Sequence, residues 1–180
     1  MLTLESLCAL FPGDRFRLHA EPVPVAEVPE PYRELLAHSA HMTVTVEAYY
    51  RDAVDVEVHE VARAGPHYAR KITLRLRHGK RVVQYGVVAV DLDALGPAVA
   101  AAIVAGRTPL GRVLIEHDVM REVHPVQFFR AALPADLAGV MGVAAGRVTY
   151  GRLGVITADG NPAVRVAEIL TPVDGRPVTS

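Results

Sequence analysis

The stretch YARKITLRLRHGKRVVQYGVVAVDL, residues 68–92, decides the fold of this 180-residue chain. Residues 68–77 alternate between apolar and polar side chains, and residues 81–91 form a second extended run that is apolar on both faces. Only the tripeptide HGK, residues 78–80, separates the two runs, and so short a connection requires a hairpin. Because a strand that is apolar on both faces lies inside a sheet, we expect residues 81–91 to be a central strand.

Further strands are expected on both sides of this hairpin. Residues 43–50 and 53–61 alternate in the same way and are typical of two neighbouring antiparallel strands. Residues 148–158 and 163–173 are separated by the turn sequence DGNP, residues 159–162, and indicate a second hairpin. The pattern predicts an α+β fold with a mainly antiparallel sheet of about six or seven strands and helices packed on one side.

Helical segments are expected around and between these strands. They are residues 2–10, a segment that begins at Pro31, the Ala-rich run 93–106, and residues 134–141. Residues 21–31 contain four prolines and predict an extended connection. We therefore expect one domain, residues 1–180, in which residues 1–30 are an N-terminal extension with a Pro-rich connection.

The stretch TPLGRVLIEHDVM, residues 108–120, joins the Ala-rich helix to a new extended segment through Pro109 and Gly111. A rigid proline followed by a freely turning glycine suits a helix-to-strand corner, and it equally suits a backbone pressed against a ligand. A strand is expected at residues 126–133. Residues 115–124 carry no pattern that assigns them a role.

Composition narrows the classes of function. With 51% apolar and 22% charged residues and a net charge of −1, the chain has no basic patch of the kind that binds nucleic acid. No apolar run reaches the ~18 residues needed to span a bilayer, and the first eleven residues lack the features of a secretory signal. We therefore expect a cytoplasmic protein with a small-molecule partner, and the oligomeric state stays open.

Cofactor and nucleophile motifs are missing from the sequence. The single Cys8 has no nearby base, and no serine stands in a nucleophile-elbow motif. The histidine pairs 38/41 and 117/124 lack the companions of a metal motif, so we expect no metal and no cofactor.

Two charged residues break the alternation of their strands. Arg70 shares a face with Ile72 and Leu74, and Glu168 shares a face with Val166 and Leu170. A buried charge needs a partner, because an unpaired one costs several kcal/mol. The two residues either form an internal ion pair, or they line a polar cavity in which Arg70 grips a ligand carboxylate.

The order of several short motifs resembles the chorismate pyruvate-lyase family, which converts chorismate to 4-hydroxybenzoate and pyruvate. The motifs are MT (residues 42–43), YARKITL, VDLDALGP, GRTPLGRVL, YGR and GNPAVRVAEILTP, and they extend from about residue 37 to residue 172. The resemblance implies a chorismate lyase-like fold that encloses a ligand cavity. The related effector-binding domains of GntR-type regulators have a similar fold, but a single-domain length without a helix-turn-helix favours the lyase.

The resemblance also implies roles for individual residues. Arg70 and Glu168 would be the catalytic pair, with Arg70 on a substrate carboxylate and Glu168 at the ring or the breaking ether. The substrate-binding residues would be Met42, the Leu110–Gly111 peptide, Arg152 for a second carboxylate, and Tyr85, which stands near a position where the family has an ionic residue.

Two functions follow as hypotheses. The first is a carbon-oxygen lyase that eliminates pyruvate from chorismate without a metal or redox cofactor. The second is a non-catalytic module on the same fold that binds a small aromatic or carboxylate ligand, or a lyase-fold enzyme with a different substrate. If an Arg70→Ala variant folds but loses activity or ligand binding, Arg70 has one of these two functions and is not merely part of a structural ion pair.

Overall fold

The hairpin predicted from residues 68–92 is present in the computed structural model, which describes residues 2–13 and 18–173. Strands β3 (His67–Leu76) and β4 (Val82–Asp91) pair antiparallel, and Lys80 in the connection has a left-handed φ of 55°. Strand β4 has β3 on one side and β7 on the other. The prediction that it is an internal strand is therefore confirmed.

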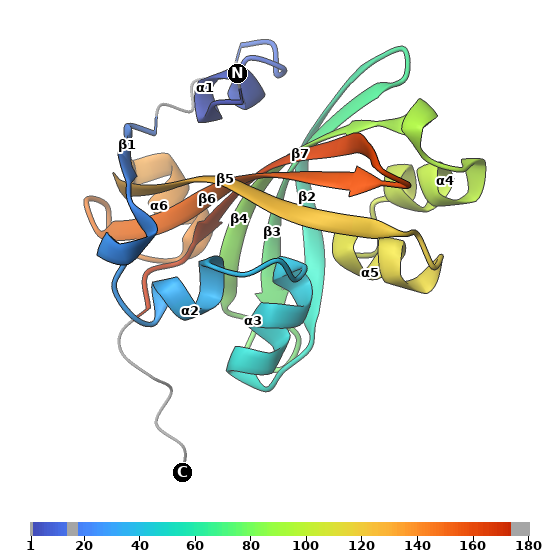
Figure 1. Cartoon of the computed structure of the whole chain (residues 1–180). Helices are drawn as coiled ribbons and strands as arrows, with labels where there is room; N and C mark the ends of the chain where they lie inside the picture. Colours follow the sequence, from blue (N-terminus) through green and yellow to red (C-terminus); the bar gives the residue numbers. More distant parts are fainter. Residues whose placement is uncertain (1, 14–17, 174–180) are drawn as a thin grey trace.

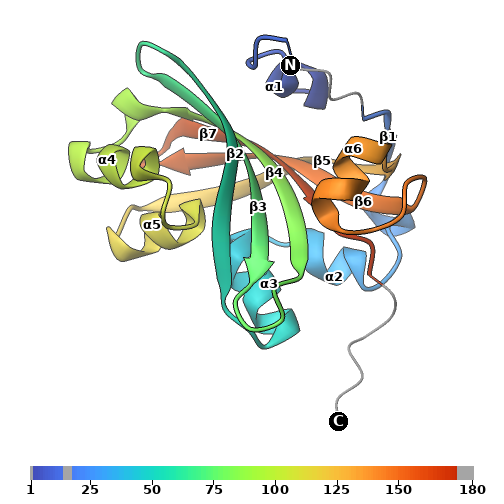
Figure 2. The same ribbon diagram turned by 180° about the vertical axis from the view of Figure 1, so that it is seen from behind.

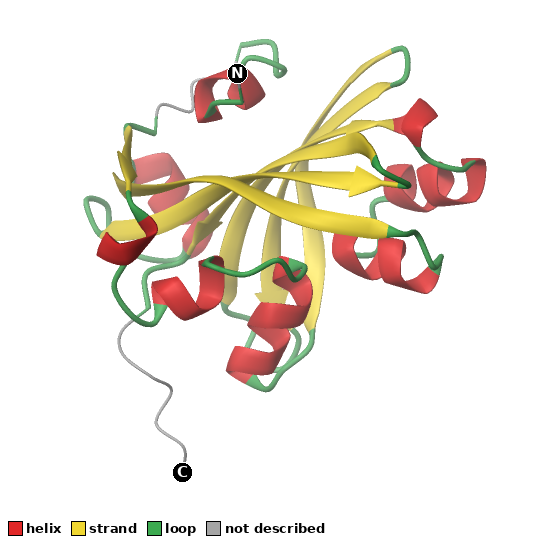
Figure 3. Cartoon of the chain, in the orientation of Figure 1, coloured by secondary structure: helices red, strands yellow, loops and turns green. Residues whose placement is uncertain are grey.

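Seven strands form one sheet in the order β1-β5-β6-β7-β4-β3-β2, and all neighbours pair antiparallel (Figure 1, Figure 3). The other strands are β1 (Ala20–Val23), β2 (Val54–Ala64), β5 (Arg121–Ala132), β6 (Val148–Ala158) and β7 (Asn161–Leu170). The second predicted hairpin is confirmed as β6 and β7. Its turn has Asp159 and Gly160 at φ values of 49° and 80°, as a two-residue hairpin turn requires.

Helices cover both faces of the sheet (Figure 2). They are α1 (Leu4–Cys8), α2 (Tyr32–Leu36), α3 (Met42–Tyr50), α4 (Pro97–Ala105), α5 (Leu110–Glu116) and α6 (Ala135–Met141), with short 3-10 turns η1 (Val25–Glu27) and η2 (Leu92–Ala94). Helices α2 to α5 pack on one face over the larger hydrophobic core, whereas α1 and α6 pack on the other face over a second core. The expectation of helices on one side thus holds only for α2 to α5.

The segment 43–50 is a helix, and its prediction as a strand is wrong. Helix α3 buries Met42, Thr43 and Val46, which share one helical face at spacings of one and four residues. The short alternation of threonine and valine imitates a strand, because β-branched residues favour strands without excluding helices. Strand β2 consequently pairs with β3, and no strand formed by residues 43–50 lies beside it.

The stretch 108–120 contains the helix α5, so the helix-to-strand corner, one of its two interpretations, is not formed. Pro109 stands just before α5 with extended backbone angles, and Leu110, Val113 and Leu114 are buried at helical spacing. The following strand β5 begins at Arg121, five residues earlier than predicted. The early part of β5 was missed because it contains Pro125, which lies at a register shift.

The N-terminal region contributes to the sheet. Residues 20–23 of the predicted N-terminal extension, residues 1–30, form β1, which pairs with β5 and ends the sheet on that side. Pro22 is tolerated there because an edge strand leaves one row of backbone groups without a partner strand. Within the described residues, no helix is long and apolar enough to cross a membrane.

Gly151 on β6 is required by close packing, and this generates a prediction. A Cβ at this position would lie 2.4 Å from Cζ of Phe129 and 2.6 Å from the carbonyl oxygen of Glu168. Gly154 on the same strand would meet its nearest atoms only at 3.4 Å. We expect Gly151→Ala to lower the free energy of unfolding by about 2 kcal/mol or more.

The matched control is Gly154→Ala, which should change the free energy of unfolding by less than about 1 kcal/mol. Urea unfolding followed by circular dichroism measures both variants. Equal effects of the two substitutions would show that the ring of Phe129 does not pack against Gly151 as described.

Candidate functional site

The floor of the candidate site is a row of four residues that lie opposite one another on neighbouring strands. The row runs Ile72, Gly86, Glu168, Arg152 across β3, β4, β7 and β6. Because Gly86 has no side chain, a hollow remains between Ile72 and Glu168. A Cβ at Gly86 would lie 3.2 Å from Cγ1 of Ile72 and would take part of that space.

The roof of the site consists of the first turns of α3 and α5. Met42 and Thr43 come from α3, and Leu110 and Gly111 come from α5. Gly111 packs directly against His41, since a Cβ at Gly111 would lie 2.8 Å from the Cβ of that histidine. Only glycine allows this approach, so the PLG sequence of residues 109–111 closes the cavity by bringing α5 against the loop before α3.

Floor and roof enclose a cavity of about 40 Å³. Four predicted site residues line it together, namely Met42, Leu110, Gly111 and Glu168. A space of this size holds a few water molecules, whereas pockets for small ligands measure roughly 300–1,000 Å³. An aromatic acid would therefore need α3 or α5 to move outward from the sheet.

Arg152 and Glu168 form a buried ion pair in which Nε of Arg152 donates to Oε2 of Glu168 over 2.6 Å. The arginine is 1% exposed, and its Nη1 donates to the carbonyl oxygens of Leu36 and His38, each at 2.8 Å. Its Nη2 donates to the carbonyl of Ala40 at 3.4 Å. Arg152 thus ties the sheet to the loop before α3, and it is not placed as a free clamp for a second carboxylate.

Arg70 does not pair with Glu168, so the internal ion pair between these two residues is not formed. Arg70 is 0% exposed, and its Nη1 donates to the carbonyl oxygen of Ile103, near the end of α4, over 3.1 Å. Within the described residues, Nε and Nη2 have no hydrogen-bond acceptor. Burial lowers the pKa of the guanidinium, while the nearby Tyr68 hydroxyl acts in the opposite direction.

Arg70 lies one row away from the cavity rather than in its wall. Its cross-strand partner is Val88, and both Val88 and the next inward residue of β3, Ile72, line the cavity.

Tyr85 lies on the opposite face of the sheet, so its prediction as a substrate-binding residue is not supported by its position. It is paired with Thr73 and Ile169, belongs to the core under α1 and α6, and stacks with His59 at a centroid distance of 6.5 Å. The neighbouring Gln84 faces the cavity instead. The sequence contained a signal for it, because Gln84 is the one amide in the apolar run VVQYGVV.

His41 is a second cavity residue that the motifs did not indicate. Its Nε2 accepts a hydrogen bond from Nε of Arg121 over 2.6 Å. Burial, followed by the positive charge of Arg121, lowers the pKa of His41 to about 4. The imidazole is therefore neutral near pH 7 and adds a polar but uncharged group to the roof.

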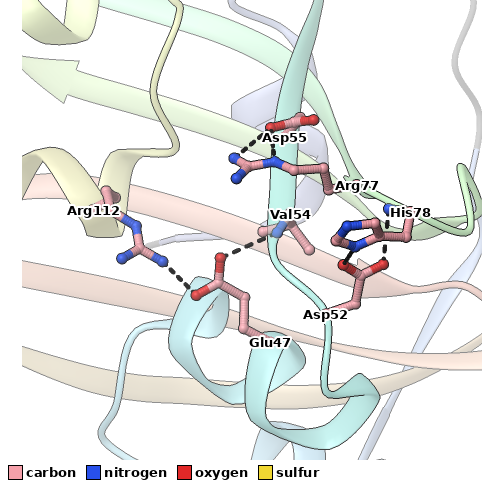
Figure 4. A network of polar contacts seen from close by, with 7 residues as sticks. All are labelled: Glu47, Asp52, Val54, Asp55, Arg77, His78 and Arg112. Carbon is pink, nitrogen blue, oxygen red and sulfur yellow. Dashed lines mark hydrogen bonds and ion pairs between the residues drawn. The ribbon is translucent and has the colours of Figure 1, made fainter.

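The two roof helices are joined on their outer side by a network of charged residues (Figure 4). The carboxylate of Glu47 on α3 accepts hydrogen bonds from Arg112 on α5 and from the backbone N–H of Val54 on β2, the latter at 3.1 Å. The Arg112 side chain is 40% exposed, so water weakens this ion pair. The network holds α3 against α5 through a contact that can open at small cost.

Two larger hollows, of about 520 and 500 Å³, lie beside α1 and the segment that follows it. None of the site residues predicted from the sequence lines either hollow. The smaller cavity under α3 and α5 therefore remains the candidate site, since it brings the predicted residues together.

The fold and the site define an α+β domain with a mainly apolar cavity, which a few polar side chains also line, between an antiparallel sheet and a layer of helices. No family model matches the chain, and no curated protein sequence does either. Solved structures match at the level of the fold. The effector domain of PhnF from Mycobacterium smegmatis is 9% identical with a TM-score of 0.55, over 73% of this chain and 88% of that domain.

Two other regulators give similar results. The possible transcriptional regulator YydK from Bacillus subtilis is 11% identical with a TM-score of 0.51, over 71% of this chain and 62% of its own length. A putative GntR-family regulator is 16% identical with a TM-score of 0.50, over 77% and 66% of the two chains. This chain thus has the chorismate lyase-like fold and spans less than two thirds of YydK. Two of these three structures are described as possible or putative transcriptional regulators, and the third is described as an effector domain.

The neutral state of His41 generates a prediction about pH. In the unfolded chain a histidine is protonated below a pKa of about 6.5, whereas folded His41 stays neutral down to about 4. The unfolded state therefore binds more protons in this window, and stability falls as the pH falls. We expect His41→Gln to reduce the stability loss between pH 6.5 and 4.5 by about 1–2 kcal/mol.

Urea unfolding of both proteins across this pH range measures the difference. The pKa of His38 is also lowered by burial, but His38 is present in both proteins and cancels in the comparison. Parallel stability curves for the two proteins would mean that His41 is not held neutral.

Proposed function

We propose that this chain is a small-molecule-binding domain whose ligand, a small aromatic or carboxylate compound, enters between the sheet and helices α3 and α5. The observation that carries the proposal is Arg70, a wholly buried cation with donors left over on Nε and Nη2 in the described structure. A planar guanidinium with free donors is suited to a carboxylate or a phosphate.

The energetics of Arg70 support a role in binding. A buried charge whose partners are one carbonyl and the Tyr68 hydroxyl, with no carboxylate, costs stability, and replacement of such charges by apolar side chains is often neutral or stabilising. A residue that is unfavourable for folding and lies next to a polar cavity is typical of a binding site, because a ligand anion supplies the missing partner.

Binding without catalysis fits the geometry better than a lyase. Oε2 of Glu168 accepts a hydrogen bond from Nε of Arg152 over 2.6 Å, so this carboxylate oxygen is engaged by the protein and is not free for a substrate. Arg152, the second arginine that a lyase would use for the dianion, is engaged by protein acceptors. The effector domain of PhnF, which has the same fold, supports a binding role as well.

The experiment mixes the protein with chorismate and, separately, with 4-hydroxybenzoate. We expect no release of pyruvate and no growth of the ultraviolet band of 4-hydroxybenzoate above the rate without protein. Calorimetric titration with 4-hydroxybenzoate should show saturable binding. Turnover of chorismate that requires Arg70 and Glu168 would overturn the proposal in favour of the lyase.

A substitution of Arg70 separates binding from folding. Arg70→Met should weaken binding of 4-hydroxybenzoate about 10- to 100-fold, because a hydrogen-bonded charge is lost. Its free energy of unfolding should stay within about 1 kcal/mol of the wild-type value, since an uncompensated buried charge is removed with it.

The matched control is Arg165→Met on β7, an exposed arginine on the opposite face of the sheet, which should leave binding unchanged. Loss of folding in Arg70→Met would identify Arg70 as a structural residue and would contradict its assignment to the ligand.

A further inference from the structure

Helices α3 and α5 are linked by one ion pair beside the cavity. Oε2 of Glu47 on α3 accepts a hydrogen bond from Nη2 of Arg112 on α5 (Figure 4). Within the described residues, Arg112 is the only side chain of α5 that forms a hydrogen bond or an ion pair with α3. Its neighbours on α5, Gly111 and Val113, are buried and carry no polar side chain.

The pair stands next to the cavity wall on both helices. Thr43 lines the cavity, and Glu47 follows it by four residues, so the two side chains share one side of α3 about 6 Å apart along the helix axis. On α5, Arg112 directly follows Gly111, which also lines the cavity. Solvent reaches the pair, since the side chains of Glu47 and Arg112 are 20% and 40% exposed.

The two partners are anchored unequally. Oε1 of Glu47 accepts a hydrogen bond from the backbone N–H of Val54 at the start of β2, over 3.1 Å, so the carboxylate is also tied to the sheet. Arg112 has no other acceptor for its side chain within the described residues. When the pair breaks, Glu47 therefore stays in place, and α5 loses its polar connection to α3.

We propose that the Glu47–Arg112 ion pair is a latch that keeps the cavity closed, and that its release lets the first turn of α5 move outward and admit a small molecule. The inference rests on the proposed function and adds the regulation of its site. The closed cavity measures about 40 Å³, so an organic acid enters only after such an opening.

The strength of the pair suits a latch. Water and salt weaken an ion pair between partly exposed side chains, and such pairs shift an equilibrium by only about two- to fivefold. A fully buried pair would be much harder to break, because two charges would lose their only compensation. A half-exposed pair instead keeps α5 closed most of the time and still opens often.

The test measures the opening without ligand, through the labelling of a cysteine in the cavity wall. Met42 is 3% exposed and lines the cavity, and Cys8 is the chain's single cysteine. In the variant Met42→Cys with Cys8→Ala, iodoacetamide therefore reacts at position 42 alone. Adding Glu47→Gln or Arg112→Met should make this labelling about two- to fivefold faster.

A double substitution separates the latch from a general loss of stability. Glu47→Gln together with Arg112→Met should label no faster than the faster single variant, since both changes remove the same interaction. In 1 M NaCl the protein with the intact pair should label nearly as fast as these variants, because the screening length falls to about 3 Å.

The matched control is Asp55→Asn, which removes an ion pair of the same network (Figure 4). Asp55 pairs with Arg77, both side chains are more than half exposed, and neither residue belongs to α3 or α5. We expect Asp55→Asn to leave the labelling rate at position 42 unchanged.

A kinetic measurement connects the latch to the ligand. In stopped-flow mixing, 4-hydroxybenzoate should associate about two- to fivefold faster with Glu47→Gln than with the wild type. Equal association rates, in spite of faster labelling, would overturn the role of the pair in ligand entry.

The remaining outcomes distinguish the latch from the proposed function. Unchanged labelling in Glu47→Gln and Arg112→Met, or equal acceleration by Asp55→Asn, overturns the latch and leaves the binding domain in place. Absence of 4-hydroxybenzoate binding in the wild type overturns the proposed function, whereas the labelling rates still decide whether the ion pair keeps the cavity closed.

Discussion

The buried contact between Arg152 and three backbone carbonyls is the constraint on which the rest of the site depends. Its guanidinium is anchored on the sheet by Glu168 and reaches the carbonyl oxygens of Leu36, His38 and Ala40 in the loop that leads to α3. The loop has few other ways to satisfy these carbonyls under the helices. By fixing the loop, Arg152 positions His41 and the first turn of α3, and so half of the roof.

Two glycines set the size of the cavity between the helices of the roof and the sheet that forms the floor. Gly86 leaves space in the floor, and Gly111 allows α5 to close on His41. The same packing that creates the cavity keeps it at about 40 Å³, too small for an organic acid. Under the proposed function, binding of an organic acid in this cavity would need the roof helices to move outward. The partly exposed pair of Glu47 and Arg112 is a contact that resists this movement only weakly.

Arg70 and Arg152 show that two buried arginines on one sheet can have different functions. Arg152 has an acidic partner and several carbonyls, and its removal would leave Glu168 buried and alone. Among the described residues, Arg70 interacts with the carbonyl oxygen of Ile103 and the hydroxyl of Tyr68 and has no acidic partner. Arg152 connects the sheet to the loop before α3, whereas the proposed role of Arg70 is to supply donors for a ligand anion. Residues at binding sites often make the ligand-free protein less stable than another residue at the same position would.

The sequence by itself determined both hairpins, the Ala-rich helix and the inward direction of Arg70 and Glu168. These features follow from local alternation and turn residues, which need no knowledge of partners. The grouping of Met42, Leu110, Gly111 and Glu168 was implied only by the family resemblance, and the structure places these four residues around one cavity. Only the tertiary structure decided that residues 43–50 are helical, because a short run of β-branched residues satisfies both periods until packing selects one. It also decided that Arg152, and not Arg70, pairs with Glu168, and that Gln84 rather than Tyr85 faces the cavity. The partner of a side chain, and the face of the sheet on which it lies, depend on the register between strands that are distant in the sequence. A register shift of one residue moves every side chain of a strand to the other face.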